Sequence, residues 1–361
     1  MQDCLIIGGG LIGMLTAREL AKSGLSVSLI EKGQLGQESS WAGGGIISPL
    51  YPWRYPDAVS QLAKWSQQHY PQLAEDLKHE SGVDPELTQN GLLILAANET
   101  EQAQSWASEF DSNLRVVSAE EVETIECRLN PELHTQGIWM PGIHQIRNPR
   151  LIQALRGSLQ YYGVQIIENT EVDDILFEKN RVQGVRTQEK IYYANQVVVA
   201  SGAWTAQILQ KQGITIEIQP VLGQMLLFRT EPGLVSRIVL SEDRYVIPRR
   251  DGRVLVGSTL EHVGFAKTTT EEAKAELHAE ALRLIPALAD YPIEHHWAGL
   301  RPGSPQGIPY IYEVEEKSGL FVNSGHFRNG VVLGPASVNL LTSMMLEQTP
   351  NFDLNPYNIC V

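Results

Sequence analysis

The amino-terminal stretch MQDCLIIGGGLIGMLTARELAKSGLSVSLIEKG constrains the fold more than any other part of this sequence. A short apolar run, a segment from 11 to 22 with helical spacing of its apolar residues, and a second apolar run ending at Ile30 predict a strand, a helix and a strand. At the first turn, Gly8, Gly10 and Gly13 have the spacing G-x-G-x-x-G. The stretch therefore predicts a β-α-β unit of the kind that binds dinucleotides.

Each glycine of the turn has a separate expected task. Gly8 would make the tight turn, Gly10 would let a pyrophosphate approach the backbone, and Gly13 would let the helix pack against the strand. The positive end of the helix dipole, at Leu11 and Ile12, would then face the phosphates. A structural unit whose glycines serve only packing is the alternative, but it does not explain why the glycines lie at the mouth of the helix.

The second strand ends in an acidic residue, Glu31, which is followed by Lys32. Glu31 lies eighteen residues beyond Gly13, where a carboxylate can accept hydrogen bonds from both ribose hydroxyls. Its charge would also repel a 2′-phosphate, so NADP is disfavoured. Both residues are therefore expected at the cofactor site.

The segment after the second strand separates FAD from NAD. Residues 36–47, GQESSWAGGGII, hold two adjacent serines and a second glycine cluster. An NAD protein would normally continue its sheet here, whereas a flavoprotein folds an irregular stretch of small residues back along the ribityl chain and the ring. The segment therefore favours FAD. The expected contacts are Ser39, Ser40, Gly44, Gly45 and Ile46.

Composition excludes several classes of protein. The net charge of -14 argues against nucleic acid as a partner, because phosphate binding needs a basic face. No apolar run is long enough to span a bilayer, and no basic region precedes the first apolar run as in a secretory signal. The three cysteines, Cys4, Cys127 and Cys360, lie far apart and lack the spacing of a metal site, so no metal is expected. A cytoplasmic protein in a reducing setting is the expectation.

The remaining segments predict an α/β fold with a Rossmann-type FAD-binding domain and an interleaved α+β domain built on an antiparallel sheet. The segment 190–202 becomes fully apolar before Gly202, as a buried parallel strand does, and Asp251–Gly252 has the spacing of a hairpin turn. We assign the FAD-binding domain to residues 1–84, 141–215 and 296–361, and the substrate-binding domain to residues 85–140 and 216–295. A helix is expected to start near Pro335, and the tail after Gln348 is expected to be a loose end.

Several motifs in order along the chain resemble one family. They are GGGLIG with Glu31, SSWAGGGI, VVVASGAWT, RYVIPRRDGRVLVGST, WAGLRPGSPQGIPYI and SGHFRNGVVLGPAS. Together they resemble the glycine oxidase and D-amino acid oxidase family of FAD enzymes, most closely the bacterial glycine oxidases of thiamine biosynthesis. The resemblance runs from residue 1 to about 348, and the last two motifs are far more specific than the first.

The resemblance implies three catalytic residues. Arg301 in GLRPGS matches the arginine that holds the α-carboxylate of the substrate, and its planar fork suits this task in a way that lysine does not. Tyr245 in RYVIPRR matches a tyrosine that gives the carboxylate a second donor. Arg328 in GHFRNG matches an arginine near substrate and flavin. The alternatives are a domain-bridging ion pair for Arg301, an ordinary strand tyrosine for Tyr245 and a structural salt bridge for Arg328.

The resemblance also implies cofactor contacts far from the amino terminus. Backbone N–H groups at the start of the last helix would face the flavin and stabilise negative charge on the reduced ring. The main chain of Val172 in NTEVDDI matches a contact to adenine, with an ordinary strand valine as the alternative. The expected contacts are Val172, Ser201, Gly202, Trp204, His326, Phe327, Arg328, Asn329, Gly330, Val331 and Val332.

The sequence departs from the glycine oxidase pattern at two positions. Asp243 stands where that pattern can have histidine, and Leu260 replaces a methionine that lines the pocket. Because of these two differences, the sequence does not determine which amine the protein prefers. Residues 48–55, SPLYPWRY, are expected at the pocket mouth, where Tyr51, Trp53 and Arg54 would either restrict access or simply pack together.

The implied reaction is oxidative deamination of glycine, other small amines or D-amino acids. A hydride would pass from the α carbon to N5 of FAD and the electrons then to O2, giving H2O2 and an imine, or an oxo acid plus ammonia, with a role in thiazole synthesis for thiamine. The partners expected are a small amino acid and O2; a homo-oligomer is compatible with the sequence.

Alternatives are a dehydrogenase for D-amino acids or secondary amines that uses a quinone or another acceptor, a flavin-binding accessory protein without turnover, and an NAD-dependent dehydrogenase. Sarcosine oxidases attach flavin to cysteine, but neither Cys127 nor Cys360 lies in a segment expected beside the ring, so FAD is expected to be non-covalent.

Overall fold

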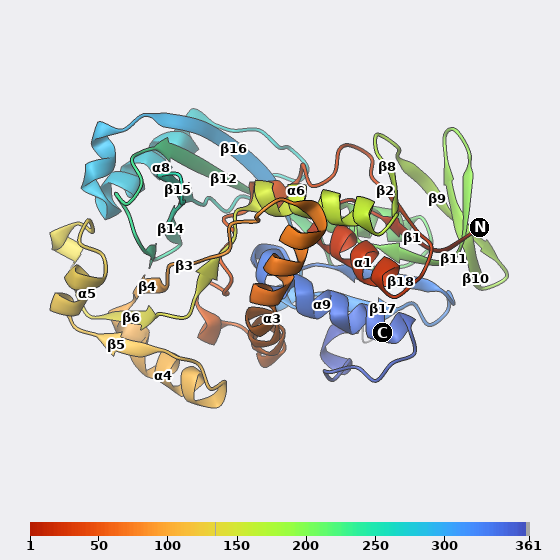
Figure 1. Cartoon of the computed structure of the whole chain (residues 1–361), viewed down its shortest axis with the longest axis horizontal. Helices are drawn as coiled ribbons and strands as arrows, with labels where there is room; N and C mark the ends of the chain where they lie inside the picture. The colour runs from red at the N-terminus through yellow and green to blue at the C-terminus, as the bar shows by residue number, and fades with distance from the viewer. Residues whose placement is uncertain (134, 359–361) are drawn as a thin grey trace.

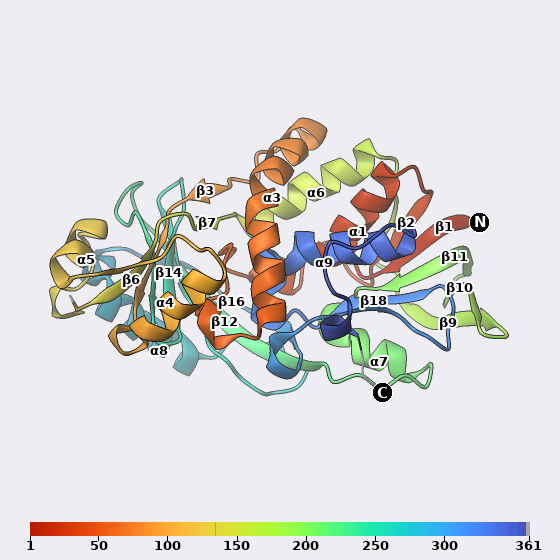
Figure 2. The same cartoon turned by 90° about the horizontal axis from the view of Figure 1, so that it is seen from below.

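Two eight-stranded sheets, each in its own lobe, organise the chain (Figure 1). The structure is a computed structural model and describes residues 1–133 and 135–358. Figures 1 and 2 both show the two lobes side by side, with the long helix α3 (Asp57–Ser81) between them and the amino terminus on the lobe that contains β1.

The first sheet has the order β17-β18-β11-β1-β2-β8, and β10 and β9 extend it beyond β11. The five strands from β18 to β8 in this order are parallel, and the predicted unit lies among them, with Cys4 opposite Val27 and Ile7 opposite Ile30. The strands are β1 (Gln2–Ile7), β2 (Val27–Ile30), β8 (Gln165–Ile167), β9 (Val172–Glu178), β10 (Arg181–Thr187), β11 (Ile191–Val199), β17 (Tyr310–Glu313) and β18 (Leu320–Ser324). The α/β class and the Rossmann-type core are confirmed.

Helices cover the first sheet on both faces. One face carries an apolar core shared with α1, α3, α6 and α9, and the other packs against α7 and the β9–β10 hairpin. The helices of this lobe are α1 (Leu11–Lys22), α2 (Ser39–Ala42), α3, α6 (Asn148–Tyr161), α7 (Thr205–Gln210) and α9 (Gly330–Met345). No described helix is both long and apolar enough to cross a lipid bilayer.

The second sheet has the order β16-β12-β15-β14-β13-β4-β6-β5 and is antiparallel except where β13 meets β4. Its strands are β4 (Leu92–Leu95), β5 (Arg115–Val117), β6 (Gly137–Met140), β12 (Gln219–Arg229), β13 (Ile238–Ser241), β14 (Arg244–Pro248), β15 (Arg253–Gly257) and β16 (Ile293–Gly303). Helices α4 (Thr100–Glu109), α5 (Ala119–Ile125) and α8 (Glu271–Leu284) accompany it, and β3 (Thr88–Gln89) pairs with β7 (His144–Gln145) apart from it.

One proposed domain boundary falls inside a strand. The division between 295 and 296 cuts β16, which pairs with β12 from Gly303 back to Ile293 and so belongs to the second sheet. The strand pairing therefore favours a boundary after Gly303. This placement matters because Arg301 then belongs to the lobe of the antiparallel sheet.

The last helix starts earlier than predicted. A proline ordinarily ends or begins a helix because it has no N–H to give the carbonyl four residues back. Here α9 begins at Gly330 and contains Pro335, and the carbonyl oxygen of Val331 accepts a hydrogen bond of 2.5 Å from the hydroxyl of Tyr70 instead. The prediction of a start near Pro335 is therefore wrong, since a side chain from α3 supplies the missing donor.

The carboxyl-terminal tail is also anchored within its described part. Tyr357 is 1% exposed, and its hydroxyl donates to the carbonyl oxygen of Ala58 at 2.9 Å. Phe352 packs edge-on against Trp65. The expected loose end after Gln348 is thus wrong for the residues up to 358.

Candidate active site

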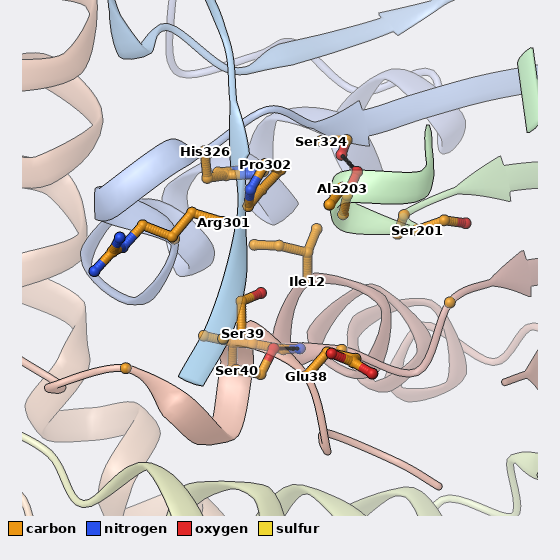
Figure 3. Close-up of a pocket in the computed structure, with 18 of the residues that line it drawn as sticks. Ile12, Glu38, Ser39, Ser40, Ser201, Ala203, Arg301, Pro302, Ser324 and His326 are labelled. Carbon is orange, nitrogen blue, oxygen red and sulfur yellow. Dashed lines mark hydrogen bonds between the residues drawn. The ribbon is translucent and has the colours of Figure 1, made fainter. Parts of the chain in front are cut away.

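A long pocket lies where the two lobes meet, and most of the predicted residues line it. One end is lined by Glu31, Lys32 and Val172 and the other by Tyr245 and Arg301. Figure 3 shows Ser201 and Glu38 on one side of the pocket and the side chain of Arg301 extending to the other. The predicted residues that line it are Gly8, Gly10, Leu11, Ile12, Glu31, Lys32, Ser39, Ser40, Gly44, Gly45, Ile46, Val172, Ser201, Gly202, Trp204, Tyr245, Arg301, His326, Phe327, Arg328, Gly330 and Val331.

Three predicted cofactor residues lie behind the pocket wall. A Cβ added to Gly13 would come 1.9 Å from the carbonyl oxygen of Gly8, so Gly13 allows the helix to pack against the turn, as expected. Val332 is 1% exposed and belongs to the apolar core. Asn329 is buried, and its Nδ2 has no hydrogen-bond partner among the described residues. Neighbouring residues line the pocket, and these three do not.

The first turn is built for close approach of a ligand. Gly8 has a φ of +113°, and a Cβ there would lie 2.6 Å from the carbonyl oxygen of Ala200, so no other residue fits. Gly10 precedes α1 without a side-chain cap. The hydroxyl of Ser40 accepts from the N–H of Leu11 at 2.8 Å, which keeps the proton of Ser40 free for an acceptor in the pocket.

The acidic end of β2 is held by the backbone. Glu31 accepts hydrogen bonds from the N–H of Gly9 at 2.7 Å and from the N–H of Gly33 at 2.8 Å. Lys32 lies with its Nζ 3.4 Å from the centre of the Trp204 ring, and burial lowers the pKa of this amine. The turn therefore presents a fixed carboxylate and a stacked amine at the same end of the pocket.

The residues at the start of α9, in the lobe of the first sheet, line the pocket. His326 is 2% exposed, and burial lowers its pKa to about 3, so the ring is neutral at physiological pH. Its Nε2 lies 3.0 Å from the hydroxyl of Ser337, which donates to the carbonyl oxygen of Gly334. Because that hydroxyl has one proton, we assign the hydrogen of the imidazole to Nε2.

Arg301 extends from β16 into the opposite end of the pocket. Its Nη1 donates to the carbonyl oxygens of Leu222 and Thr259, both at 3.2 Å, and its Nη2 donates to the hydroxyl of Ser258 at 2.7 Å. All three acceptors are neutral. Burial lowers the pKa of Arg301, and the positive charge of Arg328 lowers it further. The guanidinium has a positive charge and five N–H donors, but its three protein acceptors carry no negative charge. This end of the pocket is therefore suited to bind an anion.

Small residues surround the guanidinium of Arg301 and the ring of Tyr245. A Cβ on Gly223 would come 2.1 Å from Nη2 of Arg301, and a Cβ on Gly44 would come 3.3 Å from the ring of Tyr245. The hydroxyl of Tyr245 lies 3.7 Å from the sulfur of Met225. The two predicted substrate residues therefore share one end of the pocket, where the backbone of Gly44 and Gly223 forms part of the wall.

The pocket mouth contains a loose ion pair. Nη1 of Arg328 lies 3.8 Å from a carboxylate oxygen of Asp243, whose side chain is 72% exposed. Leu260, which the resemblance places at the pocket, is instead 45% exposed and does not line it. Asp243 thus stays close to the site, whereas the expectation for Leu260 is wrong.

In the segment 48–55, Ser48 and Leu50 line the pocket. Tyr51 is 4% exposed; its ring meets that of Trp53 edge-on, and the guanidinium of Arg54 lies 3.6 Å from its centre and pairs with Glu99. These three side chains therefore pack against one another and do not line the pocket.

Sequence reasoning missed several parts of the site. Gly223 and Gly299 face each other across β12 and β16, and a Cβ on Gly299 would come 2.6 Å from that of Ala42. A glycine inside a strand often marks such a close approach, so this signal was available. Nothing local marked Ser258 as a partner of Arg301.

The residues present fit FAD. The pocket is elongated, and the starts of two helices, α1 and α9, reach it. The backbone N–H groups of Gly44, Gly45 and Ile46 have no acceptor among the described residues, so they remain available to polar atoms of a ring. Neither Cys4 nor Cys127 lines the pocket, and Cys360 lies outside the described residues.

Comparison with known proteins agrees with this geometry. The family model described as DAO, FAD dependent oxidoreductase, matches residues 3–344. A glycine oxidase of Pseudomonas aeruginosa is 47% identical over 357 residues, which cover 99% of this chain and 98% of that protein. The crystal structure of glycine oxidase from Geobacillus kaustophilus superposes with a TM-score of 0.95 at 29% identity, covering 99% of this chain and 98% of that one. A protein named bifunctional protein ThiO/ThiG from Synechocystis sp. is 30% identical over 354 residues, which are 96% of this chain and 52% of that protein. The chain therefore belongs to the DAO family of FAD dependent oxidoreductases and is an enzyme that acts on amino-acid or amine donors.

Proposed function

We propose that this enzyme oxidises glycine or a similarly small amine that carries a carboxylate. The observation that supports this most directly is Arg301, a cation with only neutral protein partners, at the end of the pocket that also holds Tyr245. A carboxylate would accept from its guanidinium in a bidentate manner.

The residues of this end orient the substrate. Arg301 would fix the carboxylate, and the hydroxyl of Tyr245 would donate a further hydrogen bond to it. Held at two points, the substrate would keep its α hydrogen in one direction, and such fixed orientation is a large part of catalysis. Arg328 would add positive charge at the edge of the site.

We assign no side chain as a general base. The carboxylates that line the pocket, Glu31, Glu38 and Glu171, belong to the segments around its other end, and the buried ring of His326 is engaged by Ser337. A substrate that binds with a neutral amine needs no base at the α carbon, because the nitrogen lone pair can drive the departure of hydride. Residues around Arg301 would then act by orientation and by excluding water.

FAD would be held non-covalently. Gly8, Gly10 and Ser40 would hold the pyrophosphate, Glu31 the ribose, the main chain of Val172 the adenine, and the N–H groups of residues 44–46 with the start of α9 the ring. When bound, FAD would supply the chemistry of a hydride acceptor, with O2 as the proposed final acceptor of the electrons and H2O2 as its product. Acid precipitation that leaves the yellow colour in the pellet would contradict non-covalent binding.

A substrate panel tests the proposal. Purified holoenzyme would be mixed with glycine, sarcosine and D-amino acids of increasing size, and both anaerobic bleaching of the flavin and peroxide release in air would be followed. We expect bleaching and peroxide with glycine or sarcosine and declining rates with longer side chains. Bleaching without peroxide, together with reduction of a dye, would instead favour the dehydrogenase alternative. No bleaching by any amine would overturn the proposal.

The product would serve thiazole synthesis for thiamine. The relative from Synechocystis carries a second part of about the same length beyond the matched region, and its name joins ThiO with ThiG. An imine of glycine released here would be the small building block passed on. A strain that lacks this gene and grows without thiamine as well as its parent would contradict this role.

A further inference from the structure

A second buried arginine, Arg249, contacts the pocket wall from behind. It lies just after β14, is 7% exposed, and does not line the pocket itself. Its Nη2 donates to the carbonyl oxygen of Gly44 at 2.8 Å, and its Nη1 donates to the carbonyl oxygen of Ile146 at 3.1 Å and to the side-chain oxygen of Gln145. All three acceptors are neutral, so the contacts of Arg249 resemble those of Arg301.

The contact with Gly44 fixes the direction of a peptide group. A trans peptide is planar, and its C=O and the following N–H point in opposite directions. Because Arg249 holds the oxygen of Gly44, the N–H of Gly45 is directed away from Arg249. That N–H has no acceptor among the described residues, and Gly45 lines the pocket.

The peptide concerned lies at the reactive end of the pocket. A Cβ on Gly44 would come 2.7 Å from the side chain of Ile247 and 3.3 Å from the ring of Tyr245. With φ near +76° at Gly45, this segment has no side chain of its own to hold the peptide in place. A flexible glycine segment therefore depends on an outside contact, which comes from a residue 205 positions away.

We propose that Arg249 is a positioning residue that orients the Gly44–Gly45 peptide so that its N–H serves the bound flavin. The charge of the buried guanidinium strengthens the polarisation of that peptide, because a hydrogen bond to a cation at the oxygen makes the N–H a better donor. An N–H held in this way stabilises negative charge on the reduced flavin without reorganisation. The inference requires FAD in the pocket but not the amine proposed above.

The test uses sulfite on the oxidised holoenzyme, because sulfite adds to a flavin ring and leaves it with additional negative charge. In Arg249→Lys, which keeps the charge but not the three-way contact, we expect the dissociation constant for sulfite to rise about tenfold or more, as for loss of one oriented donor. The reduction potential of the two-electron couple should fall with it, by about 30 mV for each tenfold loss. Neither readout depends on turnover of an amine.

Two variants serve as controls. Arg250→Met removes the neighbouring arginine, whose contacts to Asp84, Thr88 and Leu87 do not involve the glycine segment. Gln145→Met removes a side-chain partner of Arg249 and leaves the contact to Gly44. Both should lower thermal stability while the sulfite constant stays within about twofold of wild type.

Equal sulfite constants and potentials in Arg249→Lys and wild type would overturn the proposal. So would a loss in Gln145→Met as large as in Arg249→Lys, since the effect would then come from general packing.

Discussion

Replacement of Arg301 by alanine tests the carboxylate contact most directly. A truncated member of a buried charge pair typically costs about 3–5 kcal/mol of binding. At about 1.4 kcal/mol for each factor of ten, the affinity for a carboxylate should fall roughly 140- to 3,700-fold. We expect KM to rise more than kcat falls, because Arg301 would hold the carboxylate equally in the ground state and in the transition state.

The structure predicts a second, separate effect of the same change. Alanine leaves the carbonyl oxygen of Thr259 and the hydroxyl of Ser258 without this donor, and each unsatisfied buried group costs about 1–3 kcal/mol, whereas the carbonyl oxygen of Leu222 keeps the N–H of Glu261 at 3.0 Å. This loss applies to the free enzyme and to the complex alike, so it lowers the melting temperature but cancels in KM. Arg301→Lys should lose less affinity than alanine, since it keeps the charge and loses the planar fork.

The assay combines kinetics with a binding measurement that involves no chemistry. KM and kcat for glycine would be measured by peroxide release, and acetate would be titrated into the oxidised holoenzyme while the flavin spectrum is followed. Arg253→Ala is the matched control, because Arg253 lies in the same sheet but pairs with Glu294 and Asp251. A variant of Arg301 with wild-type KM for glycine and unchanged acetate binding would refute the assignment.

Three further changes have defined outcomes. Ser40→Ala removes the acceptor for the N–H of Leu11, so it should cost about 1 kcal/mol of stability and weaken FAD retention on dialysis; unchanged retention would contradict the role at the first turn. Tyr357→Phe removes the hydrogen bond to Ala58 and should lower the stability by about 1 kcal/mol, a shift of about 2 °C in Tm; an unchanged Tm would mean that the tail contributes nothing. His326 has a folded pKa of about 3 against 6.5 for the unfolded chain, so below pH 6.5 the unfolded state binds the extra proton and stability falls by about 1.4 kcal/mol per pH unit until about pH 3. Between pH 6.5 and pH 5, the free energy of unfolding should therefore fall by about 2 kcal/mol less in His326→Gln than in wild type. An equal fall in both would show that folding does not lower the pKa of the ring.

Local pattern predicted the amino-terminal unit because its determinants are local. Strand, helix and strand follow from apolar spacing, and Gly8 and Gly13 are required by contacts within the unit or next to it. The start of α9 could not be predicted in this way. The donor that lets Pro335 lie inside a helix is the hydroxyl of Tyr70, 261 residues away from the carbonyl of Val331 that accepts it.

The same distinction separates the predicted from the missed site residues. Arg301 and Tyr245 lie in motifs that resemble a known family, so sequence alone suggested their role. Ser258 and Arg249 lie in the same motif as Tyr245, but the motif assigned them no role, and their importance comes only from what they contact. Asp243 is intermediate: its departure from the pattern was visible, but its distance of 3.8 Å to Arg328 was not.

The glycine segment 43–46 explains why the site needs both lobes. β16 passes so close to α2 that Gly299 contacts Ala42, and the indole N–H of Trp297 donates to the carbonyl oxygen of Ala42 at 3.1 Å. Arg249 holds the next part of the segment through Gly44. Each lobe alone would leave the segment without these contacts, and a run of glycines has a large conformational entropy to lose. The first lobe therefore contributes the chain that lines the pocket, and the second lobe fixes its shape, so that cofactor binding and substrate binding are both properties of the contact between the lobes.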